Sequence, residues 1–345
     1  MGSHPKTNRN TRLGLLLPWV LLTLPIVAIF VSARELPSAL HAADKPQIRI
    51  ALNHWPGFEV LYLAQELGLY AQEGADVRIV ELASLADSAR ALVQGDADAI
   101  ACTPVEAILA QEHGGKRVSI VYVFDSSCGG DVILARNDIH SISALKGRRI
   151  AIEPTSLTTV VLHEALRRVG LSIRDVEIVS MDPLNMPEAM VSGSVDAAVC
   201  YPPVSLRILE STNATTLFSS ADIPDLILDV LALDRALLES RPHEVHAILR
   251  AVRRAAEIAE SNPDLADPIM AAREGLTVGQ FRAARASGLR PYTADDQPHL
   301  LARSGPLDRA IHATREALRA ARGASWANAY NSLPEVVSLR AEQPR

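Results

Sequence analysis

The sequence predicts an α/β fold of two similar, Rossmann-like lobes that are joined by two crossing strands and face each other across a cleft. Strand-like and helix-like patterns alternate from Lys45 onward, as they do in βαβ units. The stretch ALVQGDADAIACTP at 91–104 is matched by AMVSGSVDAAVCYP at 189–202. Gly, Asp, Ala, Cys and Pro coincide in the two copies, which indicates repeated units of about one hundred residues each.

The first lobe is expected to begin with residues 45–131. Its first strand, QIRIALN, alternates apolar and polar residues and leads through the turn HWPGFE into a helix. Gly95 ends the next helix, and Thr103-Pro104 begins another. The expected strands are 47–53, 77–82, 97–102 and 118–124, and the expected helices are 60–73, 84–94 and 105–112.

The second lobe is expected over residues 132–226 and repeats this order. A second crossing strand at 226–233 then returns the chain to the first lobe, whose second part, 227–335, is mostly helical and packs on the first. Residues 336–345 are expected to form a tail. The expected second-lobe strands are 132–135, 149–152, 176–180 and 195–200, with helices at 160–169 and 187–192. The helices that follow are expected at 234–238, 242–261, 263–274, 278–286 and 306–323.

The N-terminus has the pattern of an export segment. Three basic residues precede an uncharged, largely apolar run at 13–31, and the first acidic residue is Glu35. Val31-Ser32-Ala33 offers a small-residue cleavage site, and Leu40-His41-Ala42 offers a later one. We therefore expect residues 1–33 to be a signal peptide, with an uncleaved membrane anchor as the alternative because the run is long enough to span a bilayer.

The composition argues against a nucleic-acid partner. The formal net charge is −6, and the arginines are scattered rather than gathered into a basic stripe with aromatic residues. Three cysteines, an odd count in an exported protein, allow one disulfide at most. Cys102 and Cys200 occupy equivalent positions in the repeat, which favours small buried thiols over a bridge.

Motifs of catalysis and metal binding are absent from the sequence. It has no Gly-x-Ser-x-Gly elbow, no phosphate-binding Gly-Lys loop and no Cys-x-x-Cys pair. His243 and His246 can share a helix face, but no third ligand is near them in the sequence. We expect no catalytic residue, no metal and no cofactor.

Ligands of open α/β sheets bind outside the carboxyl ends of the strands, where turns and helix N-termini present polar groups. This rule selects the candidate ligand-binding residues from the turns of both halves. They are Trp55, Gly57, Phe58, Glu59, Ser84, Thr103, Asp125, Ser127, Asp131, Glu153, Thr155, Ser156 and Tyr201.

Two aromatic residues stand out among these candidates. Trp55 lies in a Pro-Gly turn beside Phe58, and it either offers a platform for a flat or apolar ligand group or caps the core of the lobe. Tyr201 follows the second copy of the repeat where Thr103 follows the first, which favours a cleft position for both. Thr103 could also serve only as a helix N-cap.

The stretch FDSSCGGDVILAR at 124–136 joins the two halves. It is either the first crossing between the lobes, with its polar turn in the cleft, or a hairpin whose glycines supply positive φ and whose aspartates cap backbone donors. With Glu153, and with Glu59 as a further member, Asp125 and Asp131 would form an acidic pocket for an ammonium, amidinium or guanidinium group. Alternatively, some of these acids pair with arginines such as Arg136 or cap helices. The turn at 155–159 opens a helix and could hold an anionic or carbonyl end of the same ligand.

Four stretches give the chain a family resemblance: WPGFEVLYLAQELGLY at 55–70, LVQGDADAIACTP at 92–104, LKGRRIAIEPTS at 145–156 and VSGSVDAAVCYPP at 191–203. Together they resemble the nitrate/sulfonate/taurine family of substrate-binding proteins of ABC importers, from about Lys45 to Leu333. The resemblance implies the type II periplasmic-binding-protein fold, in which two lobes close on a ligand.

The resemblance also implies a function in the periplasm. We expect a monomer that captures a small-molecule ligand without chemistry and passes it to an ABC permease with its ATPase subunits. The acidic candidates favour a zwitterion such as taurine, a guanidine-like cation or an aminopyrimidine over nitrate or a simple sulfonate. Two alternatives remain open. One is a membrane-tethered solute receptor, and the other is an enzyme like the pyrimidine synthases that share this fold, although the chain has only four lysines and no cysteine cluster.

Overall fold

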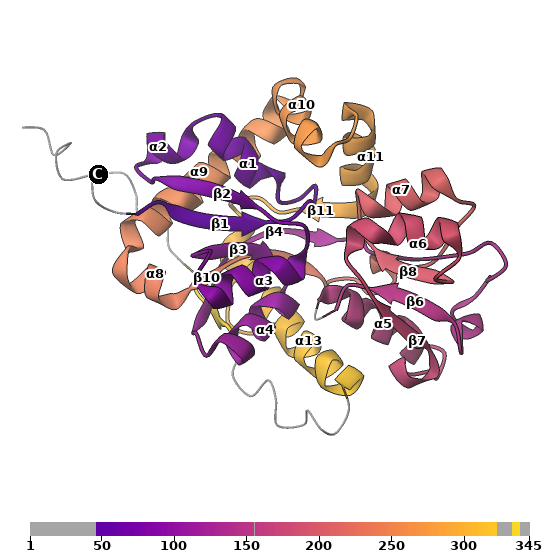
Figure 1. The fold of residues 1–345 in the computed structure, drawn as a ribbon. Helices are drawn as coiled ribbons and strands as arrows, with labels where there is room; N and C mark the ends of the chain where they lie inside the picture. The colour runs from indigo at the N-terminus through magenta and orange to yellow at the C-terminus, as the bar shows by residue number, and fades with distance from the viewer. Residues whose placement is uncertain (1–45, 155, 323–332, 339–345) are drawn as a thin grey trace, which may run out of the picture. The chain divides into compact units, whose positions relative to one another are not determined.

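Two β-sheets form the framework of the computed structural model, which describes residues 46–154, 156–322 and 333–338 (Figure 1). The first sheet has the strand order β11-β4-β10-β3-β1-β2, and β12 pairs in parallel with β4. β1 is parallel to β2 and β3, whereas β10 is antiparallel to β3 and β4. Its strands are β1 (Ile48–Leu52), β2 (Val77–Glu81), β3 (Ala99–Cys102), β4 (Val118–Ser127), β10 (Leu228–Asp234), β11 (Leu289–Pro291) and β12 (Glu335–Val336).

The second sheet repeats the central order of the first. Its order is β7-β6-β8-β5-β9, which corresponds strand for strand to β2-β1-β3-β10-β4. In each sheet the fourth strand of this series is antiparallel to the third, and the chain enters it from the other sheet. The strands are β5 (Val132–Ala135), β6 (Arg149–Ile152), β7 (Glu177–Ser180), β8 (Ala197–Cys200) and β9 (Thr215–Ser219). The predicted α/β class, with two crossings between similar halves, is confirmed.

Helices cover both faces of the first sheet. In Figure 1, α1, α9 and α10 lie on one side of it, and α3, α4 and α13 lie on the other. These and the remaining helices on this sheet are α1 (Glu59–Glu66), α2 (Leu69–Glu73), α3 (Leu85–Gln94), α4 (Pro104–Gly114), α8 (Arg235–Ser240), α9 (Pro242–Ser261), α10 (Pro263–Glu274), α11 (Val278–Gly288), α12 (Gln297–Leu300) and α13 (Pro306–Arg322).

The second sheet carries α5 (Leu157–Arg167), α6 (Met186–Ser192) and α7 (Val204–Ser211). Helix α13 packs against α5 as well as α4, so the helical C-terminal part contacts both halves rather than the first alone. The buried apolar face of α13, which includes Leu307, Ile311 and Leu318, explains this double contact. Short 3-10 turns lie at Ile142–Leu145, Ile173–Asp175, Pro183–Asn185 and Ser220–Asp222.

Several elements differ from the sequence-based expectation. The helix expected at 60–73 divides into α1 and α2 because Gly68 adopts a left-handed backbone with φ of 65°. Strand β4 continues through Ser127, since β10 and β11 pair with its C-terminal end, so Asp125 lies within a strand rather than in a turn. The elements α7, β9, β11, α12 and β12 were not expected, and β12 includes the first residue of the expected tail.

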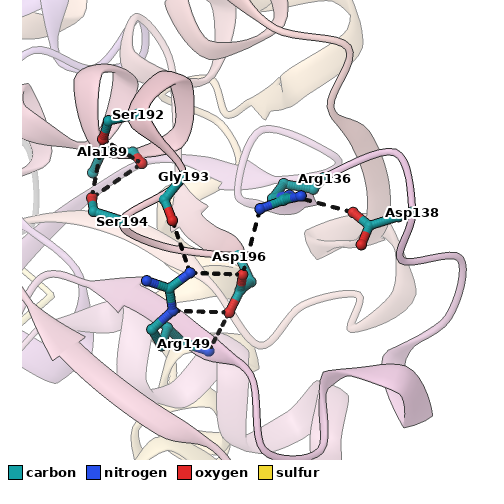
Figure 2. Close-up of polar contacts among 8 residues, drawn as sticks. All are labelled: Arg136, Asp138, Arg149, Ala189, Ser192, Gly193, Ser194 and Asp196. Carbon is teal, nitrogen blue, oxygen red and sulfur yellow. Dashed lines mark hydrogen bonds and ion pairs between the residues drawn. The ribbon is translucent and has the colours of Figure 1, made fainter.

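A side-chain clasp occurs once in each half and ties the second strand of the series, β1 or β6, to the residue just before the third, β3 or β8. In the first half, Nε of Arg49 donates to Oδ2 of Asp98 at 3.1 Å, and its Nη2 donates to Oδ1 at 2.9 Å and to the carbonyl of Gly95 at 2.8 Å. Arg149 repeats these contacts with Asp196 and the carbonyl of Gly193 at 3.2, 3.0 and 2.8 Å (Figure 2). The internal repeat therefore extends to matching charge-assisted hydrogen bonds.

Two other sequence-based expectations concern the N-terminus and the cysteines. The signal peptide or anchor expected at 1–33 lies outside the described residues. In the part that the structure describes, no helix has the length and apolar character needed to cross a bilayer. Cys102 and Cys200 are free and buried at the ends of β3 and β8, as expected.

Candidate functional site

A small cavity lies where the carboxyl ends of the strands in the two sheets face each other. It has about 10 Å³ of space for the centre of a water molecule, which is room for about one water. The two halves are therefore closed on each other. The lining residues are Asn53, Trp55, Phe58, Leu85, Thr103, Asp131, Leu157, Tyr201 and Asp229.

A chain of hydrogen bonds crosses this cavity on one side. Nδ2 of Asn53, at the end of β1, donates to the hydroxyl of Tyr201 at 3.2 Å, and this hydroxyl donates to Oε2 of Glu153 at 3.3 Å. Oε1 of Glu153 in turn accepts from the backbone N–H of Ala86 at 2.7 Å. Ala86 lies in the first turn of α3, so a carboxylate from the second half occupies a helix N-terminus in the first half.

The reciprocal contact is present as well. Glu106 in α4 forms a capping box with Thr103 through Oε2, while its Oε1 accepts from the backbone N–H of Leu157 at 2.9 Å. Leu157 is the first residue of α5 in the second half. Each half therefore places a glutamate on a helix N-terminus of the other, where an anionic ligand would otherwise find its backbone donors.

Trp55 is fitted closely into the site between two glycines. A Cβ at Gly57 would lie 2.8 Å from its Nε1, and a Cβ at Gly130 would lie 2.5 Å from Cη2. The ring meets that of Tyr201 edge-on, with centroids 6.2 Å apart. Larger residues at the two glycine positions would displace the ring, so the sequence around Trp55 fixes one wall of the cavity.

Three buried aspartates lie together, and two of them line the other wall of the cavity. Asp125 and Asp229 are direct partners in the antiparallel pair of β4 and β10, and like charges in that relation repel each other. Asp131 follows on the crossing between the sheets. Asp131 and Asp229 line the cavity. One carboxyl oxygen of Asp131, one of Asp229 and both of Asp125 have no hydrogen-bond partner among the described residues.

Burial changes the ionisation of this acidic cluster. It raises the pKa of Asp125 to about 6 and that of Asp131 to about 7. Burial and then the neighbouring charge of Asp125 raise the pKa of Asp229 well above its usual range. At the opposite wall, burial raises the pKa of Glu153 to about 7, against the opposing effect of the Ala86 N–H. An ionised carboxylate is thus costly in the closed cavity unless a positive charge or a donor meets it.

No basic residue is among the described residues that line the cavity. Within the described part of the chain, no group of three or more His, Cys, Asp or Glu side chains is arranged to hold a metal ion. A carboxylate oxygen without a partner can accept hydrogen bonds from N–H groups.

Six of the thirteen candidates from the sequence either line this cavity or form a hydrogen bond across it. They are Trp55, Phe58, Thr103, Asp131, Glu153 and Tyr201. Ser156 is buried as the N-cap of α5, and its hydroxyl has no hydrogen-bond partner among the described residues. Ser84 caps α3 next to Ala86. Thr155 lies outside the described residues.

The remaining four candidates lie apart from the cavity lining. Gly57 and Asp125 line a neighbouring cavity in the first half. The hydroxyl of Ser127 lies 2.8 Å from that of Ser220 on the crossing between the sheets. Glu59 is buried in an ion pair with Arg273, and its pKa is raised to about 7 mainly by burial.

Six residues that line the cavity or bond across it were not among the candidates from the sequence: Asn53, Leu85, Ala86, Glu106, Leu157 and Asp229. Asp229 is the acid inside the apolar run LILDVLAL, and an acid in such a run is itself a signal of a buried functional carboxyl. Asn53 ends the first expected strand, so the strand-end rule would have included it. Glu106 and Leu157 act through contacts across the cavity, which sequence spacing does not reveal.

Residues 55–266 match the model of the NMT1/THI5-like family. A binding protein of Brucella abortus (strain 2308) is 24% identical to this chain over 242 residues, which are 69% of this chain and 74% of that protein. A 4-amino-5-hydroxymethyl-2-methylpyrimidine phosphate synthase of Uromyces fabae is 23% identical over 236 residues, 64% of this chain and 69% of that protein.

Solved structures show the same fold. The alkanesulfonate-binding protein SsuA of Xanthomonas axonopodis pv. citri, bound to MOPS, aligns with a TM-score of 0.67 at 22% identity over 81% of this chain and 94% of that one. The periplasmic aliphatic sulphonate-binding protein SsuA of Escherichia coli aligns with a TM-score of 0.61 at 20% identity, over 84% and 100%. With the strand order of both sheets, these likenesses confirm the type II periplasmic-binding-protein fold.

Proposed function

The chain belongs to the NMT1/THI5-like family, and from this premise we propose that it captures a small nitrogen-bearing solute between its two lobes for import. The observation that carries the proposal is the pair of unpartnered carboxyl oxygens of Asp131 and Asp229 in a buried cavity without a basic residue in its described lining. A cationic or N–H-rich group would satisfy these oxygens through charge-assisted hydrogen bonds.

The helix N-termini at the cavity support the same ligand class. The first turns of α3 and α5 present the donors that suit a sulfonate or nitrate, but Glu153 and Glu106 already accept from them. An anionic ligand would have to displace these glutamates and would then face the buried carboxyl groups of Asp131 and Asp229. An aminopyrimidine, a guanidine-like cation or the ammonium end of a zwitterion meets no such repulsion, with Trp55 and Tyr201 as aromatic walls.

Closure follows from the size of the cavity. The space for one water admits no organic ligand, so the lobes have to separate for entry. We assign lobe 1 to residues 45–131 and 227–335 and lobe 2 to residues 132–226, with bends near 131–136 and 226–230. In the empty cleft, ionised carboxylates oppose closure because burial is costly for them, and a bound cation removes that cost. Ligand charge and closure are thereby coupled.

The role in transport completes the proposal. The closed, loaded form would dock on an ABC permease driven by an ATPase, and the chain would act outside the cytoplasm after export by its N-terminal segment. Binding without chemistry is favoured over a synthase activity by the similarity of the fold to sulfonate-binding proteins. The two lysines in the described residues, Lys116 and Lys146, form ion pairs with Asp234 and Asp175 rather than lining the cavity.

A thermal-shift and calorimetry panel with matched charges tests the proposal. Guanidinium, an aminopyrimidine and a primary amine would be compared with nitrate, ethanesulfonate and the zwitterion taurine, using the full chain. We expect the nitrogen-bearing cations, or taurine through its ammonium group, to raise the Tm of the protein. The Asp131→Asn variant should bind these compounds more weakly. Tight binding of nitrate or ethanesulfonate with no response to any amine would contradict the proposal.

A further inference from the structure

A second, larger cavity lies in lobe 1, and the cleft cavity does not account for it. Its volume is about 280 Å³, against about 10 Å³ for the cleft cavity, and the two have no lining residue in common. It is formed by β4, β11, one face of α9 and the C-terminal end of α11. Its lining residues include Tyr122, Asp125, Arg253, Arg285 and Tyr292.

Aromatic rings form the apolar wall of this cavity, which we term the lobe 1 cavity. Tyr122 and Phe124 lie edge to face with centroids 5.3 Å apart, and both are almost fully buried. Tyr292 also lines the cavity, and Val60, Leu289 and Pro291 add aliphatic surface. Such a wall suits the flat or apolar body of a small molecule.

The polar groups of the lobe 1 cavity are of both signs. Asp125 is 1% exposed, and neither of its carboxyl oxygens has a hydrogen-bond partner among the described residues. The Nε atoms of Arg253 and Arg285 are also buried without a partner in that part of the chain. Nη1 of Arg285 lies 3.7 Å from Asp267, so its charge is partly balanced. Glu257 and Glu260 complete the polar lining.

Buried polar groups are normally paired, and the lobe 1 cavity brings the Asp125 carboxylate together with the Nε atoms of two arginines, all without a partner among the described residues. A ligand with both kinds of partner would satisfy them. We propose that the lobe 1 cavity is a second small-molecule site that binds a zwitterion with an aromatic body. The amino group of the ligand donates to Asp125, its carboxylate accepts from Arg253 and Arg285, and its ring packs on Tyr122 and Phe124.

L-phenylalanine and two analogues test this site on the full chain. Phenethylamine lacks the carboxylate and 3-phenylpropionate lacks the amine, so the three compounds separate the two polar ends. By ligand-observed NMR and calorimetry, we expect L-phenylalanine to bind and each analogue to bind at least tenfold more weakly. Failure of L-phenylalanine to bind, or equal binding of all three compounds, would overturn the proposal.

Variants locate the binding and separate it from the cleft. Arg253→Met should weaken L-phenylalanine at least tenfold, and Ala256→Trp should block it by filling the cavity from α9. Arg254→Met is the matched control, because Arg254 is the next residue on α9 but donates to Glu73 at 2.7 Å. Asp131→Asn, which tests the cleft, should leave L-phenylalanine unaffected. Loss of binding in the Arg254 or Asp131 variant but not in the Arg253 variant would contradict the assignment.

Discussion

Replacing Asp131 by asparagine should ease closure of the empty protein at neutral and alkaline pH. Burial raises the pKa of Asp131 from 3.8 to about 7. The closed state therefore favours the protonated acid, and ionisation opposes closure. If the open cleft exposes Asp131 to water, the free-energy cost of burying its charge on closure is absent below about pH 4. This cost grows between about pH 4 and 7 and is constant above that range. At about 1.4 kcal/mol per pKa unit, it reaches roughly 4 kcal/mol, about half of which arises between pH 5.5 and 7.

Small-angle X-ray scattering of the full chain without ligand measures this effect. The radius of gyration of the wild type should increase from pH 5.5 to pH 8.5, and the increase should be smaller in Asp131→Asn. Asp138→Asn is the matched control, since Asp138 is half exposed in an ion pair with Arg136 (Figure 2). A radius that does not change with pH, or an Asp131 variant that expands as much as the wild type, would show that ionised Asp131 does not oppose closure.

Three further outcomes are expected. Gly57→Ala should cost about 1–3 kcal/mol of stability, read as a lower Tm by calorimetry, because its Cβ would lie 1.9 Å from Oδ2 of Asp125; an unchanged Tm would contradict this. The affinity for an organic cation should rise from pH 5.5 to 7.5 by up to tenfold per pH unit for each proton released. An affinity that calorimetry finds to be independent of pH would argue against a contact between ionised Asp131 and the cation. Asp98→Asn and Asp196→Asn should lower Tm to similar extents at pH 7. The effect of Asp196→Asn should fade in acid, since the paired arginine lowers the pKa of Asp196 and its contribution is lost as the pH falls through that pKa; a loss that persists in acid would argue against the clasp.

The sequence predicted the repeated architecture because the repeat lies in the strands and helix ends that build each sheet. Gly95 and Gly193 end equivalent helices with positive φ, and the same short turns lead into β3 and β8. The hydrogen bonds of Arg49 with Asp98 and of Arg149 with Asp196 were not predicted. These residues meet only when the parallel strands pair in the observed register. Strand β9 was missed because its TTLFS pattern is short and lies on a sheet edge.

The site was only partly predictable for a related reason. Strand ends identified Trp55, Asp131, Glu153 and Tyr201, since each follows a strand or a turn in its own half. Asp125 was expected in the same pocket as Asp131, but the pairing of β4 with β10 and β11 keeps it in the strand, where it lines the lobe 1 cavity. Contacts between halves depend on how the lobes meet, which no local pattern encodes.

A crystal structure of the full chain with the tightest-binding compound of the charge-matched panel tests the central claim most directly. We expect a nitrogen-bearing group within about 3.2 Å of the carboxylates of Asp131 and Asp229, with Glu153 and Glu106 still on the first turns of α3 and α5. An anionic group bound to the backbone N–H groups of Ala86 and Leu157, with the two glutamates displaced, would contradict it.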